Sequence, residues 1–252
     1  MSARARPYAG LADRFADREE VLALRERAAA LPRLTLEARE LADLELVVTG
    51  AAAPLRGFLG FRDYQGVLEQ LRLASGKPWP MPFTLSVTIP QLARVMHAGE
   101  AALHDDQGRL WAVLQATDAY VRNPLDEARA VHGTDDAAHP GVAYLLSRPR
   151  GLVGGPVRAL PLPDSDGSRP DPLSVRRHAP AREALLRALV LRNCGATHVL
   201  FDGEGAEREE SRRVLQRFQP WELGFTPLWR EPEAGGPVPV ADRPLRVEGV
   251  TA

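Results

Sequence analysis

The sequence predicts an α+β fold in two parts: a β-rich part over residues 1–160 with peripheral helices, and a small α/β part over residues 181–252. From Pro82 onward, short apolar runs are separated by turn residues, as is typical of strands. After residue 180, helical and strand-like runs alternate, which favours parallel pairing. The proline-rich stretch 161–180 between them is predicted to be a linker, because it can neither continue a helix nor build a core.

The first part begins with a predicted helix in ADREEVLALRERAAALPRL. Asp17 as N-cap and Glu20 three residues later have the spacing of a capping box, and apolar residues follow at helical spacing. A short helical stretch, the apolar run 44–48 and a turn rich in glycine and proline come next. Helical spacing returns in RDYQGVLEQLRLASG, with Gly76 as the expected C-cap.

Strands are predicted in FTLSVTI, AALHDDQGRLWAVLQA and GLVGGPVRAL. The letters DDQG predict a hairpin in which Gly108 takes a positive φ. In the second part, AREALLRALVLRN predicts an amphipathic helix, THVLF a strand, EREESRRVLQRF an exposed helix and LGFTPLW a second strand. The tail from Glu231, rich in proline and glycine, is expected to wrap the surface or fray.

Composition narrows the function classes. The 32 basic residues almost cancel the 33 acidic ones, which argues against nucleic-acid binding, although a local basic face stays open. We expect a cytoplasmic protein without membrane association, because no apolar run approaches the roughly 18 residues that span a bilayer and the opening MSARARPYAG lacks an apolar core. The lone cysteine, Cys194, is predicted to be buried filler rather than a nucleophile. The tryptophans are predicted to be core residues.

Two polar clusters are candidates for chemistry. His132, Asp135, Asp136 and His139 could supply metal ligands, but the glycines and proline around them favour a stiff turn, and we predict no metal site. The letters RRHAP, with Arg176, Arg177 and His178, form a small cationic spot that is a candidate for phosphate contacts; the alternative is that it is simply solvated.

The loop DGEG follows the first strand of the second part, a position where α/β proteins bind ligands. It lacks the lysine and hydroxyl of a P-loop and the three-glycine spacing of a dinucleotide fingerprint. Asp202 and Glu204 would repel a triphosphate unless Mg²⁺ stood between them.

The chain resembles the ATP sulfurylases, which join sulfate to the AMP part of ATP to give adenylylsulfate and pyrophosphate. Four blocks carry the resemblance in collinear order over roughly residues 34–160: LEARELADLELVVTGAAAPLRGFL, DYQGVLEQLRLASGKPWPMPFTL, DDQGRLWAVLQATDAYVRNPLDEARAVHGTDDAAHPGV and LVGGPVRAL. The resemblance implies a PUA-like fold for the first part, and it implies that HGTDDAAHPGV is a turn of the family. It also implies that the second part is a shortened remnant of the nucleotidyltransferase domain.

The second part departs from the family. Nothing matches the Gln-x-Arg-Asn-Pro-x-His-x-x-His stretch of the sulfurylase active site, and REALLRALVLRNCGATHVLF resembles only a later helix and strand. Where the family has Gly-Arg-Asp-His-Ala-Gly, this chain has DGEGAE, in which only Ala206 is identical. The resemblance therefore implies a vestigial nucleotide-site loop with no catalytic residue, comprising Thr197, His198, Asp202, Gly203, Glu204 and Gly205.

The function expected from these features is a catalytically inactive, ATP-sulfurylase-like binding, scaffold or regulatory module linked to sulfate activation, without a cofactor. The resemblance implies partners: a homo-oligomer, a true sulfurylase or an adenylylsulfate kinase. The alternative is a compact active nucleotidyltransferase that uses ATP and Mg²⁺, with Mg²⁺ on Asp202 or Glu204 and the phosphates on Arg176, Arg177 and His178. RNA binding is the third possibility, disfavoured by the balanced charge.

Overall fold

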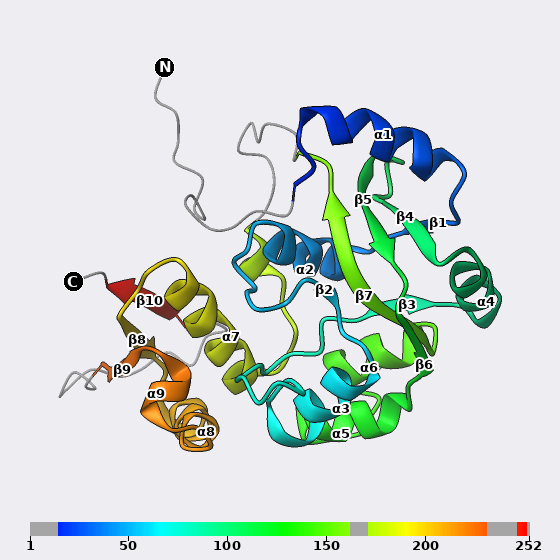
Figure 1. The fold of residues 1–252 in the computed structure, drawn as a ribbon. Coiled ribbons are helices and arrows are strands. Elements are labelled where there is room, and N and C mark those ends of the chain that lie inside the picture. Colours follow the sequence, from blue (N-terminus) through cyan, green and yellow to red (C-terminus); the bar gives the residue numbers. More distant parts are fainter. Residues whose placement is uncertain (1–14, 162–170, 231–245, 251–252) are drawn as a thin grey trace.

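The computed structural model describes residues 15–161, 171–230 and 246–250. Its larger sheet has seven strands, and the long strand β7 (Gly151–Ala159) pairs with four others (Figure 1). Five strands run in the order β1 (Arg33–Thr35), β4 (Glu100–His104), β5 (Leu110–Gln115), β7 and β2 (Gly57–Phe58), while β3 (Leu85–Val87) and β6 (Asp118–Val121) also pair with β7. Pairing is antiparallel except between β1 and β4. The expected β-rich first part is confirmed.

Six helices surround this sheet: α1 (Arg18–Ala29), α2 (Ala38–Val48), α3 (Phe61–Gln70), α4 (Ile89–Ala98), α5 (Pro124–His132) and α6 (Pro140–Ser147). The capping box of Asp17 and Glu20 begins α1 as predicted. The apolar run 44–48 belongs to α2, whose inward side it forms. The predicted C-cap at Gly76 is wrong, because α3 already ends at Gln70 and Leu71 takes the left-handed conformation, with φ 58°.

Close backbone packing explains the glycines of β7. A Cβ at Gly155 would lie 1.9 Å from the carbonyl oxygen of Gln115, and a Cβ at Gly154 would lie 2.4 Å from that of Leu59. Any side chain at either position would force neighbouring strands apart. The hairpin between β4 and β5 is as predicted, with Gly108 at φ 81°.

The second part adds α7 (Pro180–Asn193), β8 (His198–Asp202), α8 (Gly205–Leu215), the short α9 (Pro220–Leu223) and β9 (Thr226–Trp229). The predicted parallel pairing is confirmed between β8 and β9. Residues 231–245 of the tail lie outside the described residues, whereas β10 (Arg246–Val250) pairs antiparallel with β8 instead of fraying. The strand prediction missed β10 because its surroundings are rich in glycine and proline.

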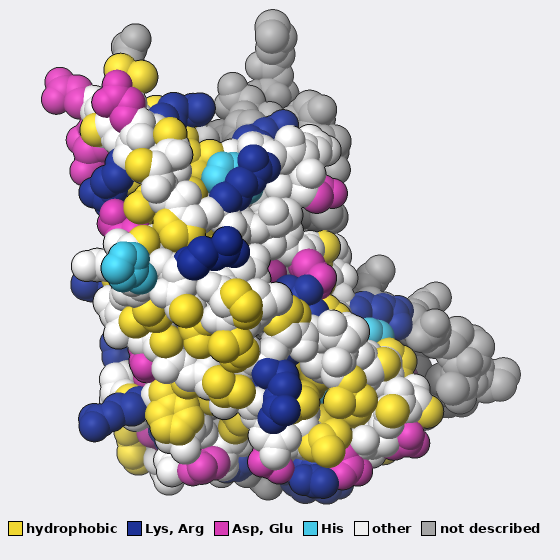
Figure 2. All heavy atoms as spheres, turned by 90° about the vertical axis from the view of Figure 1, so that its right-hand side faces the viewer, with side chains coloured by type: hydrophobic (Ala, Val, Ile, Leu, Met, Phe, Trp, Pro, Cys, Tyr) yellow, Lys and Arg dark blue, Asp and Glu magenta, His cyan; other side chains and the backbone are white. Residues whose placement is uncertain are grey.

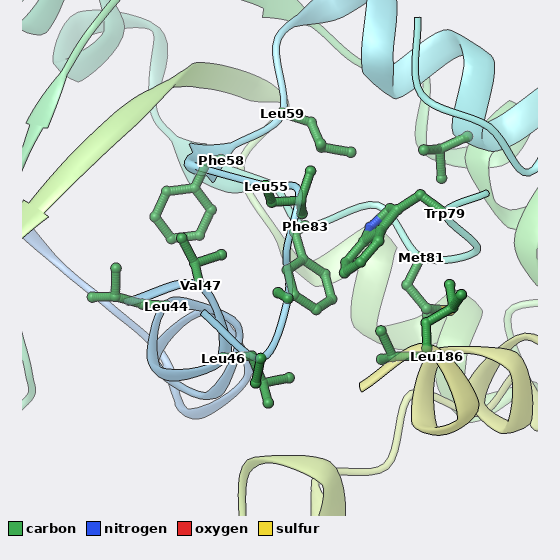
Figure 3. Close-up of a cluster of buried hydrophobic side chains, with 14 of the residues drawn as sticks. Leu44, Leu46, Val47, Leu55, Phe58, Leu59, Trp79, Met81, Phe83 and Leu186 are labelled. Atoms are coloured by element: carbon green, nitrogen blue, oxygen red, sulfur yellow. The ribbon is translucent and has the colours of Figure 1, made fainter. Parts of the chain in front are cut away.

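Both parts share one hydrophobic core. Figure 3 shows Leu186 of α7 in the same cluster as Trp79, Met81 and Phe83 of the first part. The rings of Trp79 and Phe83 meet edge to face at 5.2 Å between centroids. The cluster continues to Phe201 of β8. The shortened second part therefore completes its core on the first part, as expected from its few large apolar residues.

Three sequence expectations about burial are wrong. Residues 162–170 of the predicted linker are outside the described residues, but the 3₁₀ helix η1 (Pro172–Ser174) packs beside α2, and Pro172 and Arg177 are buried. Cys194 is exposed at the end of α7 because the chain turns there toward solvent. Trp221 is 78% exposed, since α9 is a single turn that rests on Leu223.

Arg182 of α7 holds the joint between the parts. Its buried guanidinium donates to four backbone carbonyls: those of Val67 (3.2 Å) and Leu68 (3.3 Å) in the last turn of α3, Ala130 (2.6 Å) in the last turn of α5, and Pro80 (3.0 Å). Carbonyls at a helix C-terminus have no intrahelical donor and carry partial negative charge. One cation of the second part therefore caps two helices of the first, although burial lowers the pKa of Arg182 to about 10.

Further polar contacts cross the same joint. Arg72 donates to both carboxylate oxygens of Glu222, at 2.6 and 3.0 Å. The side-chain amide of Asn193 donates to the carbonyls of Ala51 and Ala53. The contacts of Asn193 hold the C-terminal end of α7, and that of Glu222 holds α9 against the first part.

We predict that Arg182→Met lowers the free energy of unfolding by about 3–5 kcal/mol, because it leaves several buried carbonyls without a donor. Urea denaturation measures this. The matched control is Arg94→Met, at an exposed arginine of α4, which is expected to change stability by no more than about 0.5 kcal/mol. Equal effects of the two substitutions would contradict the capping role.

Candidate functional site

A small cleft of about 30 Å³ lies where α2, α5, α6 and the segment 171–179 meet. Charged and polar side chains dominate its lining, which comprises Arg39, Glu40, Asp43, Met81, Pro82, Thr84, Ser86, Arg122, Glu127, Val131, His132, Tyr144, Leu145 and Arg177. The cleft has room for about two water molecules beyond its mouth.

Two buried ion pairs form the floor of the cleft. Arg177 donates from Nη2 to Asp43 Oδ1 at 2.5 Å, and both side chains are almost fully buried. Arg122 Nη1 lies 3.5 Å from Glu127 Oε2, which also accepts a hydrogen bond from the Tyr64 hydroxyl at 2.9 Å. Burial raises the pKa of Asp43 and of Glu127, and the facing arginines oppose that rise.

Glu40 is the third carboxylate of the lining. It accepts from Arg148 Nη2 at 3.0 Å and from the backbone N–H of Ser86 at 2.9 Å. Burial raises its pKa, and Arg148 and the backbone donors lower it. Each carboxylate of the cleft is therefore matched to a cation or a donor, which is the condition under which buried charges are tolerated.

Arg39, at the mouth of the cleft, interacts with an aromatic ring and a backbone carbonyl instead of a carboxylate. Its guanidinium stacks on the ring of Tyr144, 3.8 Å from the centroid, and Nη2 donates to the carbonyl of Arg176 at 3.0 Å. Within the described parts of the chain, no carboxylate lies within ion-pair distance of this guanidinium. Desolvation lowers the pKa of Arg39, and Arg177 acts in the same direction, while Tyr144, Asp43 and Glu183 oppose this shift.

Three histidines are grouped next to the cleft, one each from the end of α5, the start of α6 and the turn before α7, and His132 is the one of them that lines it. The ring centroids of His132 and His139 are 5.0 Å apart, and those of His139 and His178 are 6.4 Å apart. His132 Nδ1 lies 3.0 Å from the carbonyl of His178, which assigns the proton of a neutral ring to Nδ1. Burial, more than the neighbouring cations, lowers the pKa of His132 to about 4 and lowers that of His178.

The candidate phosphate contacts occupy three different environments. Arg176 is exposed, Arg177 is buried against Asp43, and His178 is half-buried with φ 57°. Arg177 thus directs its guanidinium into the protein. The sequence suggested a solvated cationic spot and gave no sign of the partner Asp43.

The loop after β8 is acidic at the place where α8 begins. Asp202 pairs with Arg230 at 3.5 Å, Glu204 is the N-cap residue of α8, and Glu207 lies in its first turn. These carboxylates stabilise the helix N-terminus and compete there with any bound anion. Gly203 is buried and Gly205 has φ 52°, so backbone fills the centre of the loop.

Thr197 and His198, the other candidates of this loop, lie at the opposite end of β8. The Thr197 hydroxyl lies 3.0 Å from His198 Nδ1, and the carbonyl of Thr197 accepts from the N–H of Thr226 in β9. Their contacts are those of the sheet. The contacts of Arg177 and His178 include Asp43, Val175, Glu183, His132 and His139, so the two predicted clusters have different neighbours.

The predicted turn at residues 132–139 is confirmed. Asp136 accepts from the N–H of Ala138, and Asp135 pairs with Arg129. The described ranges contain no group of three or more His, Cys, Asp or Glu side chains arranged to hold a metal ion.

The sequence interpretation missed Arg39, Asp43, Glu127 and Tyr144, which surround the cleft. The available signal was a charge inside an apolar helical stretch, such as Asp43 in ARELADLELVV. An aspartate is almost never fully buried unless it is paired, so burial of this stretch would imply a partner. Its partner, 134 residues away, could not be read from the sequence.

A family model described as a PUA-like domain matches residues 6–162. The chain belongs to the PUA-like domain family. The sulfate adenylyltransferase of Symbiobacterium thermophilum is 40% identical over 185 residues, 72% of this chain and 45% of that protein. A probable bifunctional SAT/APS kinase 2 of Sorangium cellulosum is 41% identical over 159 residues, 62% of this chain and 27% of that protein. The resemblance to ATP sulfurylases, drawn from the four sequence blocks, is confirmed.

This PUA-like chain spans less than half the length of these relatives. A solved structure described as a hexameric APS kinase from Thiobacillus denitrificans has the same fold over 87% of this chain and 55% of its own, with a TM-score of 0.58 and 19% identity. The expected α+β fold is therefore confirmed. The helices among the described residues include none that is both long and apolar enough to cross a membrane.

We predict that Asp43→Asn lowers the free energy of unfolding by about 3–5 kcal/mol, because it leaves the buried Arg177 guanidinium without a counter-charge. The double variant Asp43→Leu with Arg177→Met is expected to recover most of this loss. Denaturation in urea measures both. Glu209→Gln at the exposed pair with Arg213 is the control, and a loss there equal to that of Asp43→Asn would contradict the prediction.

The histidine cluster predicts a stability that falls on acidification. Since the pKa of His132 is about 4 in the fold and near 6.5 in an unfolded chain, the unfolded state binds more protons between these values. Stability contributed by neutral His132 is therefore complete above pH ~6.5 and lost as the pH falls toward 4. In chloride buffers, the pH dependence of urea denaturation is expected to be weaker in His132→Asn. Parallel curves for the two proteins would contradict this.

Proposed function

We propose that this chain is a catalytically inactive, ATP-sulfurylase-like protein that acts as a binding, scaffold or regulatory module linked to sulfate activation. The observation that carries the proposal is the loop after β8. Gly203 and Gly205 stand there at the positions where the resemblance to sulfurylases implies an arginine and a histidine, and Asp202, Glu204 and Glu207 make the loop acidic. Nucleotidyl transfer from ATP to sulfate needs cations and donors directed at the negative charge that develops on the phosphate.

The joint between the two parts also supports this proposal. The guanidinium of Arg182 and the amide of Asn193 are occupied by backbone carbonyls of the first part. These side chains therefore stabilise the contact between the two parts. A shared core of this kind suits a scaffold better than an enzyme that must open and close around ATP.

A scaffold needs a surface for its partner. Figure 2 shows hydrophobic side chains gathered over the lower half of the face on the α4 side. Val121 at the end of β6 is 56% exposed and Ile89 after β3 is 55% exposed, and both strands pair with Gly151 of β7. Exposed Phe61 packs on Tyr120, the neighbour of Val121. Self-association, or pairing with a sulfurylase or an adenylylsulfate kinase, is the role proposed for this face.

The proposal predicts no turnover in either direction. The assays are pyrophosphate release from ATP and sulfate with Mg²⁺, and ATP formation from adenylylsulfate and pyrophosphate. The sulfate adenylyltransferase of Symbiobacterium thermophilum, run in parallel, is the positive control. Turnover above a blank that Asp202→Asn or Glu204→Gln abolishes would overturn the proposal in favour of the compact nucleotidyltransferase with Mg²⁺ and ATP. Calorimetric titration with adenylylsulfate and with ATP plus Mg²⁺ then distinguishes a binding module from a pure scaffold.

A further inference from the structure

We propose that the mouth of the cleft is an oxyanion site, built from Arg39 and the histidines 132, 139 and 178, that takes a doubly charged tetrahedral group such as sulfate or a phosphate. The site lies on the PUA-like part and the turn before α7, away from the loop after β8. It goes beyond the proposed function and stands or fails separately from it.

The first argument is unbalanced charge. Every carboxylate that lines the cleft is already engaged: Asp43 by Arg177, Glu127 by Arg122 and Tyr64, and Glu40 by Arg148. Among the described residues, the direct contacts of Arg39 are the ring of Tyr144 and one backbone carbonyl, while the carboxylates of Asp43 and Glu183 act on it from beyond ion-pair distance. A half-buried guanidinium with free donors and a restrained orientation is a good partner for an oxyanion, because little freedom is lost on binding.

The second argument is the position of the histidines. Three imidazoles from separate segments lie in ring contact, and the Nδ1 atom of His139 is buried without a hydrogen-bond partner in the described parts of the chain. A buried polar atom without a partner indicates a place where a further group can bind. The left-handed backbone of His178, φ 57°, brings its carbonyl to His132 and its ring toward His139. The strained left-handed backbone of His178 is maintained by the contacts that the surrounding residues make with it.

The third argument is that Arg39 and these histidines are electrostatically coupled. The charge of Arg39 lowers the pKa of both His132 and His178, in addition to the larger effect of burial. His139 and Arg176 also face His178, and Glu183 is the carboxylate that opposes them there. The Glu183 carboxylate is already occupied, since it accepts from the N–H groups of Arg177 and Ala179. A bound dianion would relieve this repulsion and raise the histidine pKa values.

Sulfate ions and the phosphate of a nucleotide share the required chemistry. Thr84 and Ser86 line the same cleft with hydroxyl groups that can donate to either. The limited volume of the cleft admits the tetrahedral group itself, so a nucleoside would have to remain outside the mouth.

The test titrates the full chain with sodium sulfate at pH 5.5 and at pH 8, against sodium chloride of equal ionic strength, and follows thermal unfolding and calorimetric heat. Saturable stabilisation by sulfate that is stronger at pH 5.5 is expected. Arg39→Gln is expected to weaken the apparent affinity about tenfold, the contribution of a charge-assisted hydrogen bond. Arg94→Gln, an exposed arginine on α4, is the matched control and is expected to bind as the unmodified chain does.

Histidine ring resonances provide a readout that does not depend on Arg39→Gln folding well. Sulfate is expected to shift the ring resonances of histidines 132, 139 and 178, to raise the pKa values of His132 and His178, and to leave the resonances of exposed His97 in place. Sodium phosphate and adenosine monophosphate are titrated in the same way. If adenosine monophosphate binds more tightly than inorganic phosphate, the ligand of the site is the phosphate of a nucleotide; if it binds equally or more weakly, the ligand is the free oxyanion. The proposal would be overturned if the stabilisation rises linearly with sulfate concentration instead of saturating, or if it is equal in the two arginine variants. It would also be overturned if sulfate does not shift the resonances of these three rings selectively.

Discussion

The structure depends on one buried cation, Arg182, that replaces missing hydrogen bonds at two helix ends. The C-terminal carbonyls of α3 and α5 point toward the same buried guanidinium. In this buried position their partial negative charges would be costly without a donor. By supplying donors from α7, the chain makes the second part a structural component of the first. The shared hydrophobic core around Leu186 and Trp79 is the apolar counterpart of the same requirement.

The constraint extends from the joint to the cleft. Because α7 is held at Arg182, the turn just before it lies against α2 and α5, where Arg177 meets Asp43 and the carbonyl of His178 meets His132. Buried charges accumulate there because three elements bring them together and each pair compensates its own desolvation. Arg39 is the member of this cluster with no carboxylate partner within the described ranges, and this imbalance makes the mouth of the cleft a place for an anion.

The loop after β8 is acidic, in contrast to the mouth of the cleft, where cationic groups gather. A strand followed by a helix N-terminus is an ordinary place to hold phosphate. Here the carboxylates of the N-cap residue Glu204 and the first-turn residue Glu207 interact with the positive end of the helix dipole of α8, and Asp202 forms an ion pair with Arg230. The fold of the PUA-like family and a strand–helix unit are thus retained without a cationic phosphate cradle at this loop. Function in this chain follows from its particular side chains, as fold alone does not determine activity.

The sequence by itself determined most of the elements, because their signals are local. The capping box at Asp17, the hairpin glycine at 108 and the alternation after residue 180 each involve neighbours in the chain. It misplaced the end of α3 and the exposure of Trp221, where packing outweighed local preference. Only the tertiary structure decided the partners of Arg182, Arg177 and Arg39. An arginine side chain can donate to acceptors that lie far away along the chain. No pattern within a helix specifies which of these acceptors the fold brings near.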